Sequence, residues 1–394
     1  MNNKIAVFAT VVLGGMVGLQ KFENEKLKTE KQEIEVEALS LVTENNQMKA
    51  QVDEHVPQEF IVWEKDKNGL PKVVKTFKAS RNDVKSRIHT FSGNVEENFK
   101  MHAHLFGCEK APSPTPTPVP DPNEPKPTQV QDWGFVKIKA EEANKIAPTL
   151  GKRVKVCVID TGVGPHDDLV VTKSATFVGG STSDIYGHGT HVAGIIAAID
   201  NTHGVVGGAH SIVDIINAKA LGDDGSGALT GITQAINFCG QNGAQIVNGS
   251  LGGGPYSQMM FDTISFWTNK GVKFVFSAGN DGGPTNYPAA YNIPGLFSVS
   301  ATDQNDMIAS FSSRGKVELA GPGVNILSTV PEQSKMAGLT NGYAKASGTS
   351  MAAPEVTAAL AMAIASGLPV GVDSVGDKSL YGQGRVDALK SVKQ

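Results

Sequence analysis

The sequence has few cysteines, few aromatic residues, no surplus of positive charge and little uninterrupted apolar sequence. Its 394 residues include 3 cysteines and 6% aromatic residues, and the net charge is −4. A negative balance without a basic block excludes an electrostatic drive toward nucleic acid, so no nucleic-acid partner is predicted. Three scattered cysteines (Cys108, Cys157 and Cys239) are too few for a disulfide framework or a zinc site. The apolar surroundings of Cys157 and Cys239 predict small buried thiols.

Residues 1–19 are typical of an export signal. One cation, Lys4, precedes an uncharged, mostly apolar run of 15 residues, 5–19. This run is short for a membrane span and suits the hydrophobic region of a signal peptide. No clear small-residue cleavage site follows, so an uncleaved signal anchor is the alternative. In both cases we expect export, to the outside or to the periplasm and cell envelope, with membrane contact only if the run stays uncleaved.

Composition divides the chain further. Residues 20–56 lack Pro and Gly and predict a long polar helix, whose heptad seam is too polar for a stable coiled coil. Residues 57–110 hold two short strand candidates and a polar helical stretch, which predict a small folded piece. Its His102 and His104 lack a carboxylate or cysteine pattern and are predicted to be surface histidines rather than metal ligands. Within residues 111–131, proline alternates with other residues, and this pattern predicts an extended tether.

Residues 132–394 have the residue pattern of an α/β domain. Valine- and isoleucine-rich runs alternate with helical patterns, and many of the 44 glycines of the chain lie in clusters between apolar runs. This predicts a doubly wound, mostly parallel sheet with helices on both faces. The expected strands are 154–159, 213–220, 245–250, 273–277 and 296–301, and the expected helices are 189–199, 229–241 and 260–270. Chemistry is then expected at the carboxyl ends of the strands.

Four polar residues stand at positions suited to acyl-transfer chemistry. Asp160 and Asn280 follow predicted strands, His188 precedes a predicted helix, and Ser350 lies in a glycine-containing turn before another helix. A serine nucleophile needs an imidazole base, and the imidazole needs a carboxylate to orient it. Taken singly, Asp160 and Asn280 also suit turns and Ser350 a helix N-cap. The histidine pair formed with His191 lacks the glutamate and the spacing of a zinc metalloprotease motif.

Three motifs occur in a fixed order: Asp160-Thr161-Gly162, His188-Gly189-Thr190-His191-Val192-Ala193-Gly194, and Gly348-Thr349-Ser350-Met351-Ala352-Ala353-Pro354. Together they resemble the three signatures of the subtilisin-like serine proteases, and the similarity extends over about residues 133–389. The resemblance implies a subtilisin-like fold and hydrolysis of peptide bonds through an acyl-enzyme. It gives Asp160 the orienting role, His188 the acid–base role, Ser350 the nucleophile and Asn280 the oxyanion donor, as in subtilisin itself. His191 is left a structural role.

The same resemblance implies two sets of binding residues. One set flanks an extended polypeptide substrate as an added β-strand: Ser250, Leu251 and Gly252 on one side and Gly225, Ser226 and Gly227 on the other. The second set matches the family's calcium site: Asp168, Ile199, Asn201, His203 and Val205. His203 departs from the family's usual apolar residue, and the N-terminal ligand is unassigned. Another departure is Glu355, where the family usually has histidine after the nucleophile motif.

The sequence therefore predicts an exported serine endopeptidase made as a precursor. Residues 57–110 are expected to act as a pro-segment and intramolecular inhibitor, and the tether to hold the self-cleavage region. Asp281 and Asn286 are expected near the primary specificity pocket, where Asp281 would favour basic side chains. The alternative is a membrane-anchored binding or scaffold protein that keeps the protease fold without turnover. An esterase of the α/β-hydrolase type needs Gly-x-Ser-x-Gly and a different residue order, and is excluded.

Overall fold

The computed structural model describes residues 57–88, 92–104, 128–334, 336 and 341–393. The predicted export signal, the long polar helix and most of the predicted tether lie outside these residues. The described chain divides into two compact units, one of residues 57–60 and 77–92 and the other of residues 61–76 and 93–393.

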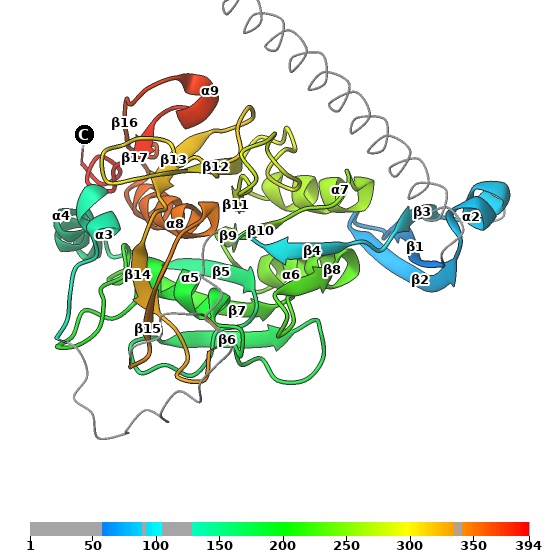
Figure 1. The fold of residues 1–394 in the computed structure, drawn as a ribbon, viewed down its shortest axis with the longest axis horizontal. Coiled ribbons are helices and arrows are strands. Elements are labelled where there is room, and N and C mark those ends of the chain that lie inside the picture. The colour runs from blue at the N-terminus through cyan, green and yellow to red at the C-terminus, as the bar shows by residue number, and fades with distance from the viewer. Residues whose placement is uncertain (1–56, 89–91, 105–127, 335, 337–340, 394) are drawn as a thin grey trace, which may run out of the picture. The chain divides into compact units, whose positions relative to one another are not determined.

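A nine-stranded sheet forms the centre of the larger unit (Figure 1). Its strands are β5 (Val154–Asp160), β6 (Val171–Thr176), β7 (Val213–Lys219), β9 (Ile246–Gly249), β11 (Lys273–Ser277), β12 (Leu296–Thr302), β13 (Leu319–Pro322), β16 (Val372–Asp373) and β17 (Arg385–Val386). They lie in the order β16-β17-β13-β12-β11-β9-β5-β7-β6, and every neighbouring pair is parallel except β16 with β17. The predicted α/β class is confirmed.

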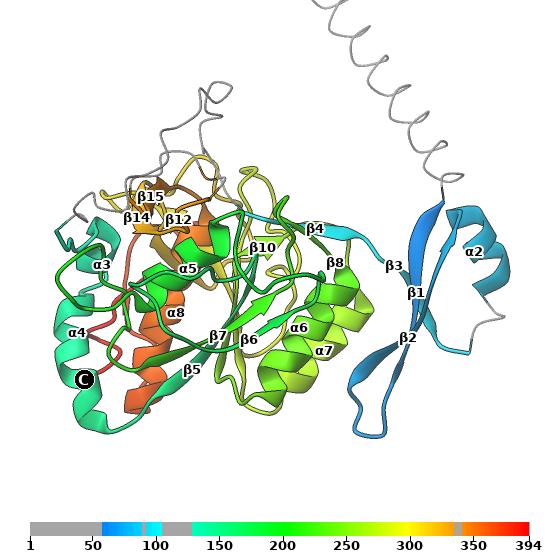
Figure 2. The same cartoon turned by 90° about the horizontal axis from the view of Figure 1, so that it is seen from below.

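Helices cover both faces of this sheet because its central strands are apolar on both sides (Figure 2). In β5, Val154, Val156 and Val158 share one apolar cluster with residues of α3 (Trp133–Lys137), α4 (Ala140–Ile146), α5 (His188–Ala197) and α8 (Thr349–Ser366). Cys157 and Ile159 point to the other face and share a second cluster with α6 (Leu229–Gln241) and α7 (Gln258–Thr268). The alternation of side chains along one strand thus divides the core into two layers.

Cys157 and Cys239 form a disulfide bond, so the prediction of two free buried thiols was wrong. Both residues are buried as expected. They are 82 residues apart in the sequence, yet the packing of α6 on β5 brings their Cα atoms to 5.7 Å. The spacing of cysteines in a sequence does not reveal which strand a helix covers, and this is why the pairing was missed.

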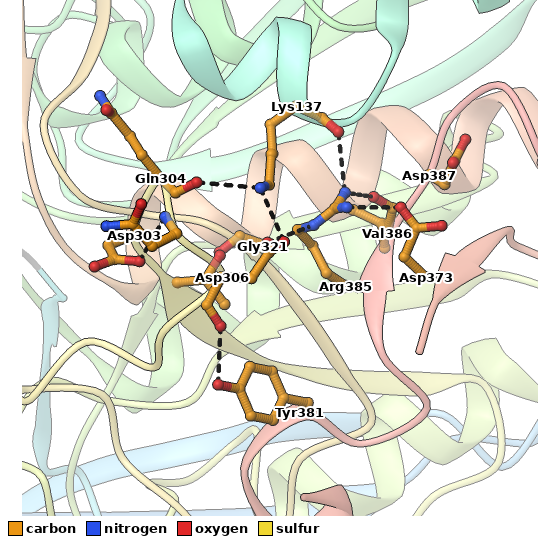
Figure 3. A network of polar contacts seen from close by, with 12 residues as sticks. Lys137, Asp303, Gln304, Asp306, Gly321, Asp373, Tyr381, Arg385, Val386 and Asp387 are labelled. Atoms are coloured by element: carbon orange, nitrogen blue, oxygen red, sulfur yellow. Dashed lines mark hydrogen bonds and ion pairs between the residues drawn. The ribbon is translucent and has the colours of Figure 1, made fainter. Parts of the chain in front are cut away.

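The C-terminal segment is tied to the sheet by a buried arginine (Figure 3). Arg385 of β17 binds Asp306 at 2.7 Å and Asp373 at 2.6 Å, and it donates to the Lys137 carbonyl at 3.0 Å. Lys139 also pairs with Asp387. This unit also contains a short 3₁₀ helix (Ala147–Leu150), α9 (Lys378–Tyr381) and the antiparallel pair β14 (Ile326–Thr329) and β15 (Tyr343–Ala346).

The described residues before residue 105 form four strands and one helix. They are β1 (Gln58–Lys65), β2 (Pro71–Ala79), α2 (Arg81–Arg87), β3 (Asn94–Glu97) and β4 (Lys100–Ala103). β2, β1 and β3 form a three-stranded sheet, and the two strand candidates of the sequence lie within β1 and β2. β4 instead joins a separate sheet, between β8 (Ser226–Ala228) and β10 (Leu251–Gly252).

Candidate active site

Asp160 and His188 meet at the carboxyl end of β5. The carboxylate Oδ1 of Asp160 lies 2.7 Å from Nδ1 of His188, and it accepts a second hydrogen bond from the Thr161 amide. Both side chains are fully buried. Nε2 of His188 has no hydrogen-bond partner among the described residues. Because a buried ring nitrogen is costly to leave unpaired, this atom is poised for a group that the site receives.

Asp184 holds the start of α5, a role that the sequence analysis missed. Its carboxylate accepts hydrogen bonds from the amides of Gly187 and Thr190 and from the hydroxyl of Thr161. Thr161 in turn accepts from the amide of Gly189. Burial raises the pKa of Asp184 above its ordinary value. This carboxylate therefore locks the first turn of α5, which carries His188, against the end of β5.

Ser350 is the second residue of α8. Its Oγ donates to the Ser250 carbonyl at 3.0 Å, and its own carbonyl accepts from the Ser250 hydroxyl at 2.9 Å. Pro354 lies inside α8 and has no N–H to satisfy the Ser350 carbonyl, which leaves that carbonyl free for Ser250. The sequence placed Ser350 in a turn before a helix, whereas α8 already begins at Thr349.

Asn280 follows β11 and faces the start of α8. Its Oδ1 accepts two hydrogen bonds of 2.9 Å from Thr349, one from the amide and one from the hydroxyl. These bonds fix the orientation of the amide and leave Nδ2 buried without a partner among the described residues. A buried N–H donor beside a helix N-terminus suits a developing negative charge.

His191 is occupied elsewhere. Its Nε2 lies 3.1 Å from the Ile326 carbonyl and 3.0 Å from the Ala344 carbonyl, and burial lowers its pKa to about 3. These contacts link α5 to β14 and β15, which fits the structural role expected for it.

The two predicted substrate-binding segments already flank a strand of the chain itself. β4 pairs antiparallel with both: Ala103 lies opposite Leu251, and Met101 lies opposite Gly227. The Ala103 amide also donates to the Gly225 carbonyl at 3.0 Å. His104, which was predicted to lie at the surface, is buried beside Ser277, and only His102 is exposed. The prediction failed because His104 is buried by Ser277 and Gly252, which are distant in the sequence and which no local pattern connects to it.

The residues expected to bind calcium lie together. Asn201 donates to Asp168 at 2.7 Å, and the Val205 amide donates to the same carboxylate at 3.2 Å. Gln129, which the sequence did not single out, brings its amide nitrogen to 2.9 Å from the Ile199 carbonyl. His203 takes part through its backbone, since its amide donates to Asn201 Oδ1. No group of three or more His, Cys, Asp or Glu side chains suited to a metal occurs among the described residues.

Comparison with known proteins identifies relatives of this chain. Residues 151–369 match the model of the subtilase family of peptidases. Subtilisin BL of Lederbergia lenta is 40% identical over 271 residues, which cover 65% of this chain and 96% of that protein. The alkaline protease of Shouchella clausii is 40% identical over 65% of this chain and 68% of its own length. The minor extracellular protease Epr of Bacillus subtilis is 41% identical over 59% of this chain and 35% of its own length.

Proposed function

The chain belongs to the subtilase family of serine endopeptidases, and from this premise we propose that Asp160, His188 and Ser350 form its catalytic triad. The observation that carries the proposal is the buried 2.7 Å contact between Asp160 and His188, with Nε2 of His188 left unpartnered. Nε2 takes the proton of Ser350 as Oγ attacks the peptide carbonyl, and later gives it to the leaving amine. Asp160 holds the tautomer and stabilises the imidazolium.

The tetrahedral oxyanion is held by Nδ2 of Asn280 and the backbone N–H of Ser350. Thr349 supports this role, because its two bonds to Asn280 Oδ1 turn Nδ2 away from Thr349 and toward the site. The amide of Ser350 is one of the first N–H groups of α8, which have no partner within the helix. These donors are in place before charge develops, so little reorganisation is needed in the transition state.

Labelling with a fluorophosphonate probe tests the triad. We expect covalent modification of Ser350 in the processed protein and none in Ser350→Ala, together with loss of peptide hydrolysis in the variant. Thr357→Ala is the matched control, because Thr357 lies further along α8 and bonds Asn248. A protein that does not label would instead be a scaffold that has kept the fold without turnover.

Residues 57–110 act as the intramolecular inhibitor of this site. β4 fills the position of a substrate strand, and the residues before it hold the ends of two helices. Glu96 accepts from the Ser257 hydroxyl and the Met259 amide at the start of α7, and Asn98 accepts from the Thr230 amide at the start of α6. A carboxylate at a helix N-terminus is favourable because it satisfies free N–H groups and the helix dipole.

Calcium would be held by oxygen atoms of Gln129, Asp168, Ile199, Asn201, His203 and Val205. The residues fit this ion: the Gln129 amide contacts two oxygens, and a half-turn of that amide would present its own oxygen to the same point. Residues 128–130 also pair with residues 203–205, so the chain segment that brings Gln129 is fixed there. A bound ion would cross-link this segment to the loop between α5 and β7.

Chelation tests the calcium proposal. Adding EDTA to the processed protein should lower the midpoint of thermal unfolding, and restoring calcium at about 100 times its Kd should return about 2.7 kcal/mol of stability. Asp168→Asn should abolish the response, whereas Asp167→Asn, which changes a more exposed neighbour, should keep it. Equal unfolding midpoints with and without calcium would contradict the proposal.

Export is supported by three observations. Residues 1–19 suit a signal segment, a relative is named as extracellular, and the buried disulfide is typical of an oxidising compartment. Within the described part of the chain, no helix is both long and apolar enough to cross a membrane. Sequencing the N-terminus of the secreted protein tests export and shows whether residues 1–19 are removed.

A further inference from the structure

The side chains of β4 alternate between the enzyme and solvent. Met101 is fully buried in the apolar cluster that contains Leu229 and Leu251, whereas Lys100 and His102 are exposed. His104, three residues beyond Met101, is again buried. Two side chains of this segment, those of Met101 and His104, therefore fill pockets, and the rest of the segment is held by backbone hydrogen bonds.

Among the described residues, one polar group lies at hydrogen-bond distance from the imidazole of His104. Nδ1 of His104 lies 2.9 Å from the hydroxyl of Ser277, the last residue of β11. Gly252 forms a wall: a Cβ atom at this position would lie 2.3 Å from Cε1 and 2.8 Å from Nε2 of the imidazole. Any side chain at position 252 would therefore close the pocket to this ring.

No carboxylate among the described residues forms a hydrogen bond or ion pair with the imidazole of His104, and Asp281 acts on the ring only through its charge. Asp281 is exposed, and its Oδ1 accepts from the Ser313 hydroxyl at 2.6 Å and from the Gly283 amide at 3.0 Å. Burial lowers the pKa of His104 to about 4, so the ring binds in its neutral form. A buried hydroxyl can pair with a neutral imidazole, but it cannot compensate the burial of a lysine ammonium.

The backbone of His104 is aligned with the nucleophile. The Ser250 carbonyl accepts one hydrogen bond of 3.2 Å from the His104 amide and another of 3.0 Å from Ser350 Oγ. The same oxygen thus holds the residue in the primary pocket and the attacking hydroxyl. Because His104 shares an acceptor with the attacking hydroxyl, its carbonyl is the candidate for attack, rather than the carbonyls of the preceding strand residues.

From these contacts we propose that the bond on the carboxyl side of His104 is the first bond the enzyme cuts in its own chain, and that its pockets select a neutral imidazole at that position and a large apolar side chain three residues earlier. The inference rests on the proposed triad. The proposed cut lies upstream of the proline-rich tether, whereas the sequence predicted self-cleavage within the tether.

The reaction balances as ordinary acyl transfer. Ser350 Oγ bonds to the carbonyl carbon of His104, and the C–N bond to the next residue breaks as His188 protonates the leaving amine. Water then hydrolyses the ester and leaves a carboxylate on His104, with Ser350 and His188 restored. The N-terminal piece remains seated by the backbone pairs of β4 until it dissociates.

Timed self-processing of the full chain tests the cleavage position. The earliest N-terminal fragment, measured by intact mass spectrometry, should end at His104. His104→Lys should slow its appearance by at least about tenfold, because the pocket must then bury an unpaired ammonium. His102→Ala is the matched control on the exposed face of the strand and should still be cut after residue 104. A first cut at any other bond would overturn the assignment.

A peptide series tests the specificity without relying on any variant. Fluorogenic acyl-Met-His-Ala-Xaa amides with Xaa as His, Phe, Lys or Ala should show the highest kcat/KM for His, at least about tenfold above Lys. Ser277→Ala should reduce the preference for His over Phe several-fold. Hydrolysis without a preference for His would sink this inference alone. Absence of both hydrolysis and fluorophosphonate labelling would sink the protease proposal itself.

Discussion

At the residue scale, the site is marked by polar atoms that the folded chain leaves unsatisfied. Nε2 of His188 and Nδ2 of Asn280 are both buried without a partner among the described residues. Their neighbours on the same side chains, Nδ1 and Oδ1, are fully bonded. One end of each side chain is thus fixed by the protein, and the other end is available for the proposed reaction. Such pre-organisation is the main source of electrostatic catalysis.

Replacing Asn280 tests the oxyanion role. Asn280→Ala should lower kcat by about 100–1000-fold, the range found for the corresponding asparagine of subtilisin, with KM nearly unchanged. The reason is that Nδ2 stabilises charge that exists only in the transition state. Steady-state kinetics on a peptide amide measures both constants. A variant that raises KM and keeps kcat would assign Asn280 to ground-state binding instead.

Glu355 is the other unusual residue near the nucleophile. It is buried in α8, its Oε2 has no partner among the described residues, and burial together with Asp132 raises its pKa well above the ordinary value. In the unfolded chain this carboxyl ionises near its usual pKa, whereas in the folded chain it keeps its proton. The folded protein therefore binds more protons, and its stability falls as the pH rises above the unfolded pKa.

Glu355→Gln should therefore abolish this loss of folding stability at higher pH. The free energy of unfolding of the wild type should fall by up to about 1.4 kcal/mol per pH unit between the unfolded and folded pKa values, and the variant should lose this slope. Urea unfolding at several pH values from 5 to 9 measures the difference. Glu141→Gln, at an exposed carboxylate paired with Lys145, is the control and should leave the slope in place. Parallel curves for wild type and Glu355→Gln would contradict the argument.

At the scale of elements, the disulfide joins a strand of the central sheet to a helix that covers the sheet. Cys157 lies on the central strand β5, and Cys239 lies near the end of α6 on the covering layer. The bond closes a long loop that contains β6, α5, β7 and most of α6. In the chain-entropy account, such a cross-link stabilises the native state chiefly by restricting the unfolded chain.

The double variant Cys157→Ala, Cys239→Ala should lose up to about 4–5 kcal/mol of stability, since the closed loop spans 82 positions. Guanidinium unfolding of the processed protein under oxidising conditions measures the loss. Cys108 is not part of this bond, so Cys108→Ala serves as the control, with a change within about 0.5 kcal/mol expected. Equal stability of the wild type with and without reductant would show that the bond does not form.

At the scale of the whole molecule, the fit of β4 in its groove depends on the charge of His104. The groups that face it are Ser277, His188, His102 and Asp281. Its pKa is lowered from 6.5 to about 4, mainly by burial. The seated strand therefore prefers the neutral ring: this stability is fully present above pH 6.5 and is lost as the pH falls toward 4.

Acidification from pH 7 to pH 5 should consequently loosen the proposed inhibitory strand by about tenfold to thirtyfold in its local opening equilibrium. Ser350→Ala keeps the chain uncut, so hydrogen exchange of the amides of residues 101–104 at pH 5 and 7, corrected for intrinsic rates, measures this opening. His104→Gln should keep much of the packing and remove the extra acid sensitivity. Equal acid sensitivity in both proteins would assign the opening to another group.

Much of this protein could be predicted from the sequence because local chemistry is decisive there. The helix at residues 229–241 and the strand at 273–277 were predicted with the bounds that the structure has, since apolar periodicity and turn residues mark them clearly. The polar edge strand β6 and the short β13–β15 were not predicted, because their pairing depends on neighbours distant in the chain. The order of the three motifs was enough to select Asp160, His188 and Ser350 as candidates, and the position of Asn280 after a predicted strand added the fourth.

Only the tertiary structure decided which residues meet. Gln129 at the proposed calcium-site loop, Asp184 behind His188, the Cys157–Cys239 bond and His104 against Ser277 all join positions that no local pattern connects. The physical reason is that each contact depends on which face of which strand a segment covers, and packing fixes that choice globally. The sequence by itself thus determined the candidate reacting groups and the class of fold, and packing determined their supports, the cross-link and the contacts of His104.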